Sequence, residues 1–113
     1  MTAPAFLIGP LPSRQAYAAQ LHTTFRIHLD AEQSRDVELV EVTAGPSLAG
    51  YEQFSLFFQA PPETPPRQNV YRLEHPYLGS TELLLVPVSS EADGVKFQAV
   101  VSVRVEASGS GGT

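Results

Sequence analysis

The segment that decides the fold is residues 71–88, with the sequence YRLEHPYLGSTELLLVPV. Two strand-like runs flank a corner, HPYLG, at residues 75–79, and this pattern predicts a β-hairpin. Pro76 restricts the corner, and Gly79 supplies the positive φ that a tight turn needs. Pro87 has no backbone N–H, so its strand is expected to be an edge or to carry a β-bulge there. The residues that define the turn are predicted to be His75, Pro76 and Gly79.

Alternation of apolar and polar residues predicts further strands on both sides of this hairpin. It begins at Phe25, and it is clearest in residues 95–106. At about 3.3 Å per residue, a straight strand of that length would span roughly 40 Å, more than the width of a domain of this size. We therefore expect the last strand to bend or to overhang. Residues 54–59 predict a strand on which Phe57 faces away from the other phenylalanines.

Two other segments carry irregular features. Residues 37–43 change phase after Leu39, which predicts a β-bulge or burial on both faces. Residues 44–53 are expected to form a loop, because Gly and Pro punctuate them. Residues 60–69 contain four prolines, which exclude a helix or a central strand. This proline-rich segment is expected to wrap over an edge of the sheet.

The region before the first strand predicts one short helix. Ser13 is a suitable N-cap for a helix over residues 14–21, with Tyr17 and Leu21 on one face. Together these elements predict an all-β fold with one short N-terminal helix, built as a small antiparallel barrel or sandwich of about six strands. The predicted organisation is an extended arm at 1–12, a single β domain at 13–106 and a flexible Gly/Ser tail at 107–113.

Composition excludes several classes of function. The 113 residues include no cysteine, which rules out disulfides, thiolate metal ligands and thiol nucleophiles. The net charge is −5 and the arginines are scattered, so nucleic-acid and anionic-membrane binding are not expected. No apolar run reaches the roughly 18 residues of a membrane-spanning helix, and no signal peptide is recognised. A cytoplasmic location is the default expectation, and export within an assembly stays open.

No arrangement of residues predicts catalysis, a metal site or a cofactor. The three histidines, at 22, 28 and 75, fit no zinc spacing. An enzyme would have to combine His75 with Glu74 or Glu82, and nothing local places these side chains together. The sequence contains neither a nucleophile elbow nor a phosphate-binding loop. We therefore expect a protein that is not an enzyme and has no cofactor.

Protein partners or self-assembly are the favoured interpretation, through arms, an exposed edge and outward apolar side chains. The predicted partner-binding residues are Phe6, Leu7, Ile8, Phe57, Pro62, Pro65, Pro66 and Val100. The alternative is a barrel that binds a small molecule or a glycan, with a shallow site lined by Tyr51, Tyr71, Tyr77 and Phe57.

Several stretches together resemble a small bacterial family of domains of unknown function. They include FSLFF at 54–58 and YRLEH at 71–75, followed by LG at 78–79 and LVPV at 85–88. The resemblance implies a compact all-β domain and no established catalytic activity. It also implies genes near phage-tail-collar-like fibre proteins. The sequence hypothesis is therefore a non-enzymatic structural or interaction module that acts as an accessory subunit of a larger assembly, and the resemblance implies a phage-tail-like fibre as that assembly.

Overall fold

The computed structural model describes residues 12–45 and 50–104. Phe6, Leu7 and Ile8 of the predicted partner-binding set lie outside these residues, as does the predicted tail at 107–113. The elements, in chain order, are α1 (Arg14–Ala18), β1 (Thr24–His28), β2 (Ser34–Ala44), β3 (Tyr51–Ala60), β4 (Asn69–His75), β5 (Gly79–Glu91) and β6 (Gly94–Arg104).

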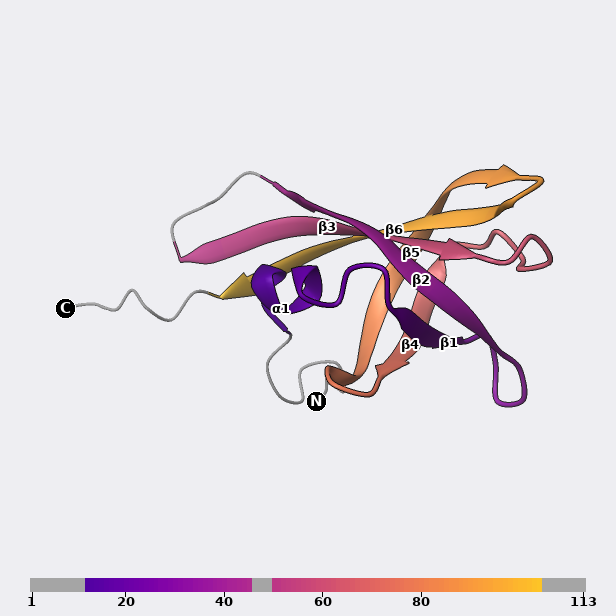
Figure 1. The fold of residues 1–113 in the computed structure, drawn as a ribbon, viewed down its shortest axis with the longest axis horizontal. Helices are drawn as coiled ribbons and strands as arrows, with labels where there is room; N and C mark the ends of the chain where they lie inside the picture. Colours follow the sequence, from indigo (N-terminus) through magenta and orange to yellow (C-terminus); the bar gives the residue numbers. More distant parts are fainter. Residues whose placement is uncertain (1–11, 46–49, 105–113) are drawn as a thin grey trace.

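The strands close into one antiparallel barrel in the order β1-β2-β3-β6-β5-β4 (Figure 1). The all-β prediction is confirmed, and of its two architectures the barrel is correct. Two predicted boundaries are wrong. Residues 44–53 are not all loop, because β2 runs to Ala44 and β3 already begins at Tyr51. The helix ends at Ala18 instead of residue 21, and His22 then adopts a positive φ of 67°.

Alternate residues of every strand fill the barrel. Phe54, Phe58 and Phe97 are completely buried, together with aliphatic side chains from all six strands. Tyr17 of α1 seals one end of the barrel, where its ring lies 5.9 Å from Phe54 and 6.5 Å from Phe25. The interior is therefore a packed core rather than a ligand cavity, as expected for a small barrel.

Three long strands, β2, β5 and β6, extend beyond the end of one neighbouring strand. β2 pairs first with β1 and then with β3, with a register shift between Leu39 and Glu41, so the predicted bulge is confirmed. β5 pairs first with β4 and then with β6, and it shifts register between Pro87 and Ser89. The bulge predicted as one alternative at Pro87 is thus present.

The last strand overhangs the barrel, as its length predicted. β6 pairs with β5 only as far as Gln98, but it pairs with β3 from Val95 to Arg104. Figure 1 shows these ends of β3 and β6 running on together past α1.

The proline-rich segment between β3 and β4 lies at the end of the barrel away from α1. Thr64 is buried there, and its N–H donates to the carbonyl of Pro61 at 3.0 Å. The hydroxyl of Tyr71 donates to the carbonyl of Arg67 at 2.7 Å, which ties the segment to β4. Pro62, Pro65 and Pro66 themselves are exposed.

Candidate functional site

Exposed apolar side chains gather on the outer wall formed by β4, β5, β6 and β3. Val70 and Leu84 face each other across β4 and β5, and they are 54% and 49% exposed. Val86 follows Leu84 on the same face of β5, and Gln98 of β6 separates it from Phe57 of β3. We define the outer apolar patch as the exposed pair Val70 and Leu84 together with the half-buried side chains of Val86 and Phe57.

Val100 borders this patch on the overhanging part of β6. It is 60% exposed and points outward, two residues beyond Gln98. Isolated exposed apolar residues are normal on protein surfaces, whereas a contiguous group marks a contact site more often. The registers therefore bring two predicted partner-binding residues, Phe57 and Val100, to the same wall.

The wall formed by β1, β2 and β4 is charged instead. Arg26 stands between Asp36 of β2 and Glu74 of β4, and its guanidinium lies 3.2 Å from the Asp36 carboxylate. The Nε2 of His28 donates to Glu74 at 3.0 Å, and this hydrogen bond holds the pKa of the Glu74 carboxyl below its usual range. Arg72 lies 3.8 Å from the same carboxylate. These opposite charges neutralise one another and leave no unbalanced cluster.

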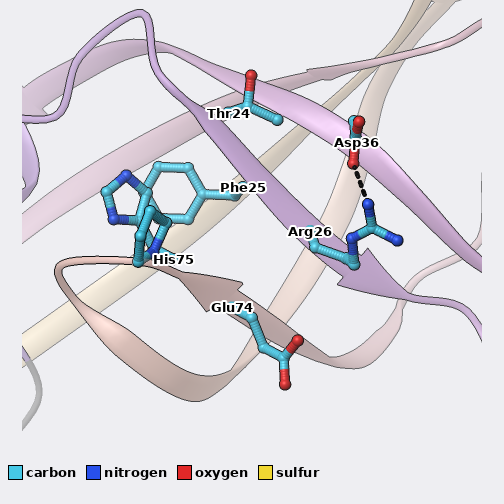
Figure 2. Close-up of a pocket in the computed structure, with 7 residues that line it drawn as sticks. Thr24, Phe25, Arg26, Asp36, Glu74 and His75 are labelled. Atoms are coloured by element: carbon cyan, nitrogen blue, oxygen red, sulfur yellow. Dashed lines mark ion pairs between the residues drawn. The ribbon is translucent and has the colours of Figure 1, made fainter.

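A shallow depression of about 450 Å³ opens on this charged wall beside the hairpin corner. Figure 2 shows the rings of His75 and Phe25, which contact each other at a tilt, on one side and the Arg26–Asp36 ion pair on the other. The Glu74 carboxylate points away from the His75 ring. The His75 ring and the Glu74 carboxylate, one of the two pairs considered for acid–base chemistry, therefore do not face each other.

His75 is buried at the corner, and both of its ring nitrogens are engaged. Nδ1 accepts from the backbone N–H groups of Tyr77 at 3.0 Å and Leu78 at 3.4 Å. The proton must then be on Nε2, which donates to the Thr23 hydroxyl at 2.9 Å. Burial lowers the pKa of His75, which favours the neutral ring. The side chain holds the corner against the segment between α1 and β1.

The remaining predicted site residues do not converge. Pro62, Pro65 and Pro66 follow Ala60, which pairs with Val95, whereas Val100 pairs with Ser55. Five residues along β3 correspond to roughly 17 Å. The tyrosines of the alternative ligand site are also separate, because Tyr71 is in the core while Tyr77 is 81% exposed on the β4–β5 turn. The grouping of tyrosines proposed for a glycan site is wrong.

Sequence reasoning missed Val70 and Leu84, although a signal was present. Leu84 lies in the continuous apolar run LLLV, which reads as wholly buried. Tyr71 and Leu73 of β4 face the core. The hairpin pairs Tyr71 with Leu83, so Leu83 and Leu85 of β5 face the core as well. Applying this phase strictly would have placed Leu84 outside.

No cation site or membrane helix is found in the described part of the chain. Within residues 12–45 and 50–104, no three His, Asp or Glu side chains are grouped to hold a metal ion. The helix within the same residues is neither long nor apolar enough to cross a membrane.

The fold and its surface define a class: a small, closed six-stranded antiparallel barrel with a filled interior, a charged wall and an apolar wall. Residues 12–101 match the family described as Domain of unknown function (DUF6916). Because the match covers more than half of the chain, this chain belongs to that family. No curated protein and no solved structure matches it.

Proposed function

We propose that this domain is a non-enzymatic interaction module and acts as an accessory subunit of a larger assembly. A fibre-like assembly of the phage-tail type is the one that the sequence resemblance favours. The observation that carries the proposal is the outer apolar patch on a barrel with a packed interior. Burying apolar side chains releases roughly 25 cal/mol per Å², so the exposed Val70–Leu84 pair favours contact with another protein.

The hydrogen bonds of His75 and Glu74 support the same function. Both nitrogens of His75 are used to build the corner, and the Glu74 carboxylate is bound to His28. A general acid or base needs a proton-transfer group that is free to meet a substrate. The packed interior likewise favours partner binding over the small-molecule or glycan alternative, because a ligand would have only the outer surface to contact.

The test is to express the full chain in its native cells and to measure the mass of the complex that contains it. Leu84→Lys places a charge at the centre of the patch, and we expect it to shift the chain from a complex to the free form. Ser80→Lys is the matched control, since Ser80 is also exposed on β5 but pairs with Glu74 on the charged wall. If the wild-type chain runs free, or if both variants stay in the complex, the proposal is wrong.

A further inference from the structure

The overhanging part of β6 has an open backbone edge. Residues 99–104 pair with β3 on one side, and no described strand pairs with them on the other. In an antiparallel strand, alternate N–H and C=O groups point to each side, so such an edge is a template for another strand.

β2 and β5 also extend beyond their neighbours, and each carries a feature that interrupts strand pairing at one point. The segment after α1 covers β2, because His22 N–H donates to the Leu39 carbonyl at 2.7 Å and Leu39 N–H donates to the Thr23 carbonyl at 3.2 Å. β5 carries a bulge beside Pro87, which cannot donate. Proteins use these devices to stop unwanted pairing. β6 contains no proline or bulge from residue 99 to residue 104.

We propose that this edge pairs with the same edge of a second copy of the chain, antiparallel and about a two-fold axis at Val101. The proposal deepens the proposed function, since it names one neighbour in the assembly. The argument for a second copy is charge. The chain has a net charge of −5, yet residues 97–103 include no charged residue. Two copies can therefore meet here without local repulsion.

The register follows from the alternation of β6. Facing residues in an antiparallel pair lie on the same side of the sheet, so an axis through Val101 sets Ala99 opposite Val103 of the second copy. It also sets Val100, which points outward, opposite Ser102 of the second copy. The result is a continuous six-stranded sheet in the order β2-β3-β6-β6-β3-β2. A pairing this short buries less than about 1,200 Å², so the dimer should be reversible.

Sedimentation velocity of the full chain over a range of concentrations tests this pairing. We expect a concentration-dependent monomer–dimer equilibrium that Val100→Lys shifts to monomer without changing the thermal midpoint at low concentration. Val88→Lys is the matched control, because Val88 is also exposed but lies on β5, outside both the β6 edge and the outer apolar patch, and it should leave the dimer intact. A wild-type monomer at every concentration contradicts the proposal, as does a dimer that Val100→Lys does not weaken.

Cysteine cross-linking tests the register independently, because the natural chain has no cysteine. An equal mixture of Val100→Cys and Ser102→Cys chains should form more disulfide dimer on mild oxidation than either chain alone. Ser80→Cys, on the opposite wall, gives the background. Equal yields from all samples overturn the two-fold axis at Val101. The two proposals can fail separately. If the isolated wild-type chain is monomeric but Leu84→Lys still releases the chain from its native complex, the pairing of two copies is wrong and the proposed function stands.

Discussion

His75 occupies the point where the hairpin corner meets the segment between α1 and β1. Its ring packs against Phe25 at a tilt of 45° with 4.4 Å between centroids, and its two nitrogens form hydrogen bonds to the corner and to Thr23. Removing the ring leaves the N–H groups of Tyr77 and Leu78 without this acceptor. We expect His75→Ala to lower the free energy of unfolding by about 1–3 kcal/mol in urea titrations at pH 8. A loss as small as that of an exposed-site control, His22→Ala, would contradict this role.

Stability should also depend on pH through His75. Burial lowers its folded-state pKa below the unfolded value of about 6.5, so the unfolded chain binds the proton more readily. The contribution of neutral His75 to the free energy of unfolding is complete above pH 6.5, and it is lost as the pH falls through the folded-state pKa. At pH values below 6.5, we expect the urea concentration at the unfolding midpoint to decrease in the wild type. We expect a smaller decrease in His75→Gln. Parallel pH profiles for the two proteins would contradict this assignment.

Gly94 is the glycine that packing constrains most clearly. Its φ is 143°, and a Cβ there would meet the carbonyl oxygen of Ala60 and the side-chain amide of Gln59. Gly79 has a φ of 81° and open space around it. We expect Gly79→Ala to cost about 1–2 kcal/mol from backbone strain alone, and Gly94→Ala to cost more because β3 must also shift. Thermal unfolding of the two variants checks this order, and the reverse order would contradict it.

At the scale of elements, α1 contributes mainly one side chain. Tyr17 is 1% exposed and seals the barrel, while Leu21 is 36% exposed. The sequence paired these two residues on one helical face, but the helix stops at Ala18 and the chain turns away at His22. The four-residue spacing of Tyr17 and Leu21 could not reveal this early end of the helix. The end depends on hydrogen bonds between the segment after the helix and Leu39, which is distant in the sequence.

Variants of Tyr17 separate its ring from its hydroxyl. The hydroxyl is buried and has no hydrogen-bond partner in the described structure. We expect Tyr17→Phe to change the free energy of unfolding by less than about 1 kcal/mol, and Tyr17→Ala to lower it by about 3–5 kcal/mol through the cavity that it leaves. Chemical denaturation measures both changes. A large loss in Tyr17→Phe would show that the hydroxyl is needed.

The strands show which parts of a barrel can be predicted from sequence. The alternation in 95–105, the phase break after Leu39 and the proline at 87 describe single strands, and these features predicted β6 and two bulges. Barrel closure depends on β4 meeting β1, and this pairing joins residues such as Glu74 and Arg26 that lie far apart in the chain. Local patterns therefore left barrel and sandwich equally open.

At the scale of the whole molecule, the barrel separates two surfaces. The wall of β1, β2 and β4 binds its own charges in pairs, while the wall of β4, β5, β6 and β3 exposes apolar side chains. The phase of the sequence predicted that Phe57 and Val100 point away from the core, and the structure places both on this second wall. The sequence could not join them to Val70 and Leu84, because the four residues come together only through the cross-strand registers.

The central claim is that the outer apolar patch is the contact surface of this module. Hydroxyl-radical labelling tests it most directly, because it reports the exposure of individual side chains. We compare the isolated chain with the chain inside its native complex and use Tyr77, exposed on the β4–β5 turn, as the reference. The account predicts that labelling of Val70, Leu84 and Phe57 falls in the complex while that of Tyr77 persists. Unchanged labelling of the patch, with protection confined to the charged wall, would contradict it.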